Sequence, residues 1–142
     1  MTLTDNKVAV KVEAVIPGSP EAAFDAWIAP DKLEQWFCGG KTSSSEAYVC
    51  AHEGGCYLIV MKGDRDWPHA GNYLEVSRGK RLRFTWYTPS TIHQRSEVDV
   101  RFEKVEDGVR VAILHSGLPP DMEGGFRDGW AELLANLAAI ST

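Results

Sequence analysis

The chain has 142 residues, of which 44% are apolar and 25% are charged, and its net charge is −5. A chain of this size and composition is expected to fold as a single domain, residues 1–142, around one core rather than to be disordered. Its cations are scattered among a larger number of acids, which excludes a basic surface for nucleic acid, and no apolar stretch is long enough to span a membrane.

The N-terminal part of the chain is predicted to form one strand and two short helices. Apolar residues alternate with small or charged ones from Lys7 to Ile16, which is the period of a half-buried strand. Ser19-Pro20-Glu21 then supplies the hydroxyl N-cap, the proline and the acid that typically begin a helix. Pro30 cannot continue this helix but can open another, so we expect a second short helix from Asp31 to Phe37, ended by Gly39-Gly40.

Six more strands are predicted after residue 41, near residues 44–52, 56–62, 70–77, 80–87, 93–104 and 109–116. Turn signals lie at residues 53–55, 77–79 and 106–108, and Asp107-Gly108 is the strongest hairpin signal among them. Because no crossover helix fits between these strands, the sheet is expected to be antiparallel. Residues 63–69 are predicted to be a solvated connection, in which Trp67 could alternatively cap the mouth of a pocket.

The last predicted element is a long helix from about Met122 to Ile140. Its apolar residues fall on one face at spacings of three and four, namely Phe126, Trp130, Leu133, Leu134 and Leu137. Only the sheet offers an apolar partner large enough to bury this face. The order of elements therefore predicts an α+β fold of the helix-grip kind, in which a curved antiparallel sheet of about seven strands surrounds the C-terminal helix.

Six short motifs, spread over nearly the whole chain, carry a family resemblance. They are Ser19-Pro20-Glu21-x-x-Phe24-x-x-Trp27, Pro30-x-x-Leu33-x-x-Trp36, Gly54-Gly55-x-Tyr57-x-x-x-Met61, Gly71-x-Tyr73-Leu74-Glu75-Val76, Arg81-Leu82-x-Phe84-Thr85-Trp86 and Gly129-Trp130-x-x-Leu133-Leu134. In this order they resemble the START-like (SRPBCC, helix-grip) superfamily, and within it the homologues of the C-terminal domain of the heat-shock protein 90 ATPase activator. The resemblance implies a deep hydrophobic cavity, which different members use to bind lipids, hormones or polyketides and sometimes to transform them.

The predicted ligand-binding residues are Trp36, Tyr57, Ile59, Met61, Tyr73, Phe84, Trp86, His115, Phe126 and Trp130. Strand and helix periods turn most of them, although not Trp36, toward one another. They would form an aromatic-lined pocket between the sheet and the long helix. The alternative is that these side chains simply fill the core, because large aromatic residues supply much of the burial that a small domain needs.

Three single residues have both a functional and a structural interpretation. His115 ends an alternating strand pattern on the inward face, where it could act as an acid or base or be a buried neutral histidine. Gly129 interrupts the long helix, which suggests close packing by a sheet residue or a ligand. Glu75 would give the pocket a polar group or would face solvent.

Cysteines and targeting signals bear on the cellular compartment. The odd number of cysteines argues against a secreted disulfide framework, and residues 1–7 lack the pattern of a secretory signal, so we expect a cytoplasmic protein. Cys50, His52 and Cys56 surround one hairpin, but they lack the fourth ligand of a zinc site. No cofactor motif occurs, and neither a metal nor a cofactor is predicted.

Three functions are consistent with these features. The first is a binding module for a small apolar or aromatic ligand, which would involve no nucleic acid and no membrane. The second is an enzyme of the polyketide cyclase type, in which His115 would assist as an acid or base. The third is a co-chaperone of heat-shock protein 90. The activator has a further N-terminal domain, whereas this sequence begins almost at its first predicted strand. This difference favours the first two functions. A homodimer could form through an exposed sheet edge or the tryptophan-bearing short helices.

Overall fold

The computed structural model describes residues 7–91 and 94–141. Residues 1–6, for which we expect no secretory signal, and the predicted strand start at residue 93 lie outside the described residues. No helix within the described ranges combines the length and the apolar composition that a membrane crossing requires.

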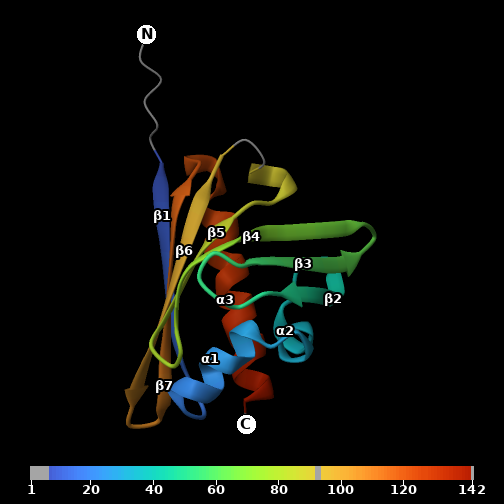
Figure 1. The fold of residues 1–142 in the computed structure, drawn as a ribbon. Helices are drawn as coiled ribbons and strands as arrows, with labels where there is room; N and C mark the ends of the chain where they lie inside the picture. Colours follow the sequence, from blue (N-terminus) through green and yellow to red (C-terminus); the bar gives the residue numbers. More distant parts are fainter. Residues whose placement is uncertain (1–6, 92–93, 142) are drawn as a thin grey trace.

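The described residues contain one antiparallel sheet of seven strands in the order β1-β7-β6-β5-β4-β3-β2. The strands are β1 (Val8–Ile16), β2 (Thr42–Val49), β3 (Cys56–Gly63), β4 (Asp66–Ser77), β5 (Arg81–Trp86), β6 (Ser96–Val105) and β7 (Gly108–Leu118). Strands β1, β6 and β7 run side by side along the length of the molecule, whereas β3 and β4 run across them, so the sheet is strongly bent (Figure 1). The predicted curved antiparallel sheet is confirmed.

Three α-helices lie against this sheet: α1 (Pro20–Ile28), α2 (Pro30–Trp36) and α3 (Glu123–Ile140). The predicted N-cap of α1 is confirmed, because the Ser19 hydroxyl accepts a hydrogen bond from the Ala22 amide at 3.1 Å. Helix α3 runs along the sheet, while α1 and α2 lie at one end of it (Figure 1). Four residues of the predicted face of α3 are buried, namely Trp130, Leu133, Leu134 and Leu137, and the fifth, Phe126, is half-buried.

The hairpin predicted at residues 106–108 is confirmed as the connection between β6 and β7. Val105 pairs with Gly108, so Glu106 and Asp107 form a two-residue turn. Gly108 has a φ of 143°, and a Cβ atom there would lie 2.1 Å from the carbonyl oxygen of Ile16. A side chain cannot occupy this position, which explains why the hairpin signal contains glycine.

The predicted connection over residues 63–69 is wrong, because most of it belongs to β4. Lys62 pairs with Asp66 and Met61 pairs with Trp67, so β3 and β4 form a hairpin with a short turn. The charges and Pro68 suggested a loop, but this part of β4 pairs only with β3, and proline is tolerated where a strand has a neighbour on one side. Trp67 lies under the Arg65 guanidinium, 4.2 Å from the ring centroid, rather than over a pocket. The ends of β2 and β6 also differ from the predicted ends by up to three residues.

Two of the single-residue interpretations are resolved by the fold. The pairing of β4 with β5 shifts between Tyr73 and Glu75, and this irregularity turns Glu75 to the outer face, where its carboxylate lies 3.5 Å from Arg81. Glu75 therefore does not add a polar group to the interior. The close packing of a sheet residue on Gly129 is also wrong, since a Cβ atom there would meet nothing within 4 Å among the described residues.

Candidate functional site

A small gap lies between the sheet and the helices α1 and α2, and we call it the interior gap. Its lining residues come from α1, α2, the segment after α2 and strands β3 to β5: Trp27, Leu33, Phe37, Tyr57, Ile59, Tyr73, Leu82, Phe84 and Trp86. Its volume of about 10 Å³ is close to the lower limit for a single water molecule. Among the described residues, side chains therefore fill the interior, as in the filled-core alternative, and leave no open cavity of the kind that the resemblance implied.

Some of the predicted ligand-binding residues line this gap and the others do not. Those that line it are Tyr57, Ile59, Tyr73, Phe84 and Trp86. Trp36 lies beside it, with its ring 4.9 Å from that of Trp27 and its indole nitrogen donating to the Ala26 carbonyl. Met61 is half-buried at the edge of the core. The remaining three, His115, Phe126 and Trp130, pack against Trp86 and do not line the gap.

Four gap-lining residues were missed by the sequence analysis: Trp27, Leu33, Phe37 and Leu82. Three of them come from the helical segment that precedes the sheet. The sequence signal that could have identified this segment was the aromatic pair Trp36-Phe37 just before Gly39-Gly40. Large apolar side chains next to a turn are expected to be covered by the core. Strand and helix periods alone do not show that this segment closes one end of the sheet.

His115 is fully buried and belongs to a chain of hydrogen bonds that joins α3 to the sheet. The indole nitrogen of Trp130 donates to Nδ1 of His115 at 3.0 Å, so the neutral ring carries its proton on Nε2 and donates it to Ser96 Oγ at 2.9 Å. The Ser96 hydroxyl in turn donates to the carbonyl of Trp86. Burial lowers the pKa of His115 from 6.5 to about 3. Both ring nitrogens are occupied, which leaves the imidazole no free proton or lone pair for acid–base catalysis.

His69, which the sequence analysis did not single out, lies closer to the gap. Its ring is 5.1 Å from that of Trp86 and 5.7 Å from that of Phe37. Its Nδ1 atom is 3.2 Å from the carbonyl oxygen of Ile59, and since a carbonyl only accepts, Nδ1 carries the proton of the neutral ring. Burial lowers the pKa of His69 and outweighs the backbone hydrogen bonding, which raises it. The ring is therefore kept neutral in an apolar environment.

Two tryptophans on the wall of the gap have unsatisfied indole groups. Trp27 and Trp86 are each only 3% exposed, and neither Nε1 atom has a hydrogen-bond acceptor among the described residues. A buried donor without an acceptor costs on the order of 1–3 kcal/mol. By contrast, the hydroxyl of Tyr57, another gap residue, donates to the Thr85 carbonyl at 2.7 Å.

Phe37 fills the centre of this region from the end of α2. Its ring is 2% exposed and packs within 6.3 Å of the rings of both Trp86 and Trp130. The chain after Phe37 is attached to α3 by polar contacts: the Gly40 amide donates to Glu132, and the Asn136 amide donates to the carbonyls of Trp36 and Cys38 at 3.2 and 2.8 Å. We call these the loop contacts. The phenyl ring is thus held by a loop rather than by a central element of the sheet.

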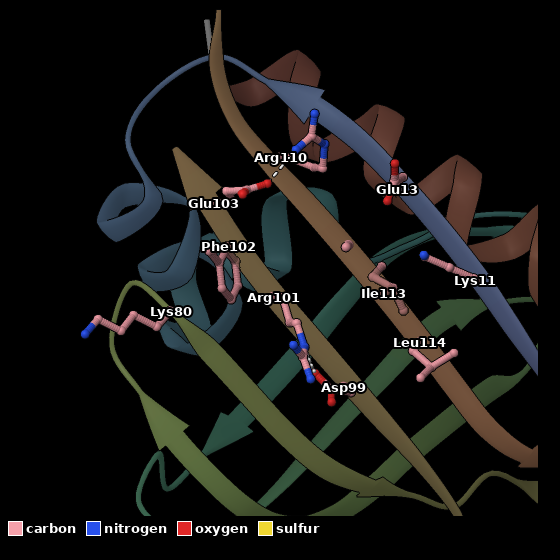
Figure 2. A pocket seen from close by; sticks show the side chains of 11 residues that line it. Lys11, Glu13, Lys80, Asp99, Arg101, Phe102, Glu103, Arg110, Ile113 and Leu114 are labelled. Carbon is pink, nitrogen blue, oxygen red and sulfur yellow. Dashed lines mark hydrogen bonds and ion pairs between the residues drawn. The ribbon is translucent and has the colours of Figure 1, made fainter. Parts of the chain in front are cut away.

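A second and larger hollow lies on the outer face of β1, β6 and β7 (Figure 2), and none of the predicted site residues lines it. Its volume is about 660 Å³, and Ala112 and Leu114 lie between charged side chains from the neighbouring strands. Figure 2 shows that some of these charges pair with each other, Arg110 with Glu103 and Arg101 with Asp99. The hollow is open to solvent, whereas small-molecule sites usually enclose most of the ligand surface. We therefore regard the interior gap as the better candidate site despite its small volume.

The hairpin that suggested a metal contains two exposed thiols. Cys50 and Cys56 lie opposite each other, joined by a hydrogen bond from the Cys50 amide to the Cys56 carbonyl. His52 uses Nδ1 in a contact with the Glu53 carbonyl. Across the described residues, no three His, Cys, Asp or Glu side chains gather in a way that could hold a metal ion.

Comparisons with known proteins agree with the fold and with the family resemblance. The family model described as "Activator of Hsp90 ATPase homolog 1-like protein" matches residues 17–142. Among solved structures, protein CV1439 of Chromobacterium violaceum is similar with a TM-score of 0.84 and 21% identity, over 94% of this chain and 96% of that one. A protein of unknown function from Staphylococcus aureus, SA2116, has a TM-score of 0.78 and 22% identity, over 96% and 94% of the two chains.

DynU16, described as a putative protein in the dynemicin biosynthetic locus, has a TM-score of 0.76 and 16% identity, over 92% of this chain and 46% of that one. At these identities the structural matches show the fold alone. No curated protein matches the sequence significantly.

Proposed function

The chain belongs to the Activator of Hsp90 ATPase homolog 1-like family, and we propose that it binds a small apolar or aromatic molecule at the interior gap, between α1–α2 and strands β3 to β5. The observation that carries this proposal is the composition of the gap wall, which consists of aromatic and aliphatic side chains around one ring, Phe37, that comes from a loop. A similar fold in DynU16, a protein from a biosynthetic locus, is in keeping with a role toward a small molecule.

Entry of a ligand requires Phe37 to leave the interior. Its ring can move outward if the loop contacts of Glu132 and Asn136 are released, because the segment from Cys38 to Lys41 is not part of the sheet. Removing a phenyl ring leaves space for about one aromatic ring, which the gap would then join. The ligand that fits is therefore a molecule with one aromatic ring and a small attached or fused aliphatic group.

The energetic cost of this opening sets the expected affinity. Burial of a phenylalanine side chain stabilises a protein by about 1.5–3 kcal/mol, so exposing Phe37 weakens ligand binding by roughly ten- to a hundredfold relative to an open site. A truncation of Phe37 removes this cost. It also leaves a cavity, which costs about 3–5 kcal/mol of stability.

The experiment is a titration of the protein with indane, a two-ring hydrocarbon, followed by NMR. We expect saturable binding to the wild-type protein, contacts between indane and the rings of Tyr57 and Phe84, and roughly ten- to a hundredfold tighter binding to Phe37→Ala. Phe24→Ala is the matched control, since Phe24 is equally buried but does not line the gap. Absence of saturable binding to both the wild type and Phe37→Ala would rule out the proposed function.

A further inference from the structure

The unsatisfied indole groups of the gap wall limit the chemistry of a ligand there. Trp27 from α1 and Trp86 from the end of β5 both pack against Trp130, with ring centroids 5.9 and 5.2 Å from it. The Nε1 atoms of Trp27 and Trp86 have no acceptor among the described residues, whereas that of Trp130 donates to His115. An indole nitrogen can only donate, so its partner must be an acceptor atom.

The charge of the ligand is limited by the other gap residues. None of the nine residues that line the gap is a lysine, an arginine or a carboxylate. An ionised group would therefore be buried without a partner, which is far more costly than burying a neutral one. The nearby imidazole of His69 does not change this, because burial lowers its pKa and keeps it neutral.

A ligand carbonyl group matches the unpaired donors of the gap residues. Among these residues the indoles of Trp27 and Trp86 are donors that lack an acceptor, whereas the Tyr57 hydroxyl already donates to the Thr85 carbonyl. A ketone, quinone or lactone oxygen supplies an acceptor and brings no donor that needs a partner of its own.

We propose that the interior gap selects neutral, planar aromatic molecules that carry a carbonyl oxygen, and that the unpaired indole N–H group of Trp27 or of Trp86 donates to this oxygen. The aromatic part of the ligand takes the place of the Phe37 ring, so this inference rests on the proposed function. It adds a chemical class to the ligand and gives the two tryptophans the role of specificity-determining residues.

The test compares 1-indanone with indane, two molecules of nearly the same shape that differ in one carbonyl group. The measured quantity is the preference ratio, which is the dissociation constant of indane divided by that of 1-indanone. It is determined for the wild type and for the variants Trp27→Phe and Trp86→Phe. Comparing this ratio between a variant and the wild type cancels the difference in hydration between the two ligands and any change in cavity size that affects both ligands equally. We expect the preference for 1-indanone to fall about tenfold in at least one of the two variants.

Trp36→Phe is the matched control, because Trp36 already donates to the Ala26 carbonyl and does not line the gap. Its preference ratio should equal that of the wild type. A second measurement needs no variant: the carbonyl stretch of bound 1-indanone should lie at lower frequency than in an alkane solvent.

Three outcomes separate this inference from the proposed function. A lower preference ratio in at least one gap variant than in the wild type, together with a lowered carbonyl stretching frequency of bound 1-indanone, supports the inference. Binding of both molecules with an unchanged ratio in both gap variants, or an alkane-like carbonyl stretch, overturns the inference and leaves the proposed function intact. Failure of both molecules to bind the wild type and Phe37→Ala overturns both.

Discussion

The hydrogen-bonded chain around His115 makes the stability of this protein depend on pH in a way that one substitution can isolate. In the folded protein burial holds the pKa of His115 at about 3, whereas an unfolded histidine has its ordinary value of 6.5. Between these two values the unfolded chain binds a proton that the folded protein does not bind. The free energy of unfolding therefore decreases as the pH falls below 6.5, and this loss continues until the pH reaches about 3.

The size of this effect follows from the two pKa values. At about pH 5.0 the unfolded histidine is stabilised by protonation by roughly 2 kcal/mol, because each unit below its pKa corresponds to about 1.4 kcal/mol. At about pH 7.5 the effect is close to zero. His115 alone should thus remove about 2 kcal/mol of stability over this range, before most carboxylates begin to titrate.

The assay is urea unfolding of the wild type and of His115→Gln at both pH values. Glutamine keeps one donor and one acceptor for Ser96 and Trp130 but does not titrate. We expect the variant to be less stable at neutral pH yet to lose about 2 kcal/mol less than the wild type on acidification. His52→Gln, at an exposed position, is the control and should behave like the wild type. Equal losses in the wild type and His115→Gln would refute the assigned burial and protonation state of His115.

Two further predictions concern stability. Gly129→Ala should raise the free energy of unfolding by about 0.5–1 kcal/mol, since alanine is the better helix former and a Cβ atom meets nothing within 4 Å there. A decrease in the urea midpoint would show that the helix packs differently at this point. Tyr57→Phe should lower the free energy of unfolding by about 1–2 kcal/mol, because the buried Thr85 carbonyl loses its 2.7 Å hydrogen bond. An unchanged unfolding curve would mean that this bond contributes nothing to stability.

Much of the fold could be predicted from local patterns. The alternation in Lys7–Ile16, the cap at Ser19 and the apolar face of Met122–Ile140 each reflect a period or a capping rule that involves only neighbouring residues. The segment 63–69 could not be predicted in this way. Its charges and Pro68 are typical of a loop, and only the pairing with β3 makes it a strand.

The site shows the same division more clearly. Strand parity correctly turned Tyr57, Ile59 and Phe84 inward, but it could not show that Phe37 returns from the end of α2 to fill the space between them. It also could not distinguish His115, whose two nitrogens are satisfied, from Trp27 and Trp86, whose donors are not. Hydrogen-bond satisfaction depends on atoms contributed by several distant elements.

The sequence by itself determined the architecture of this protein, because the order of strand and helix periods allows the long apolar helix to be buried only against the sheet. Only the tertiary structure decided that the interior is closed and which polar groups within it lack a partner. Packing and hydrogen bonding at that level depend on where side chains from α1, α2, β5 and α3 meet in space, and no local pattern contains that information.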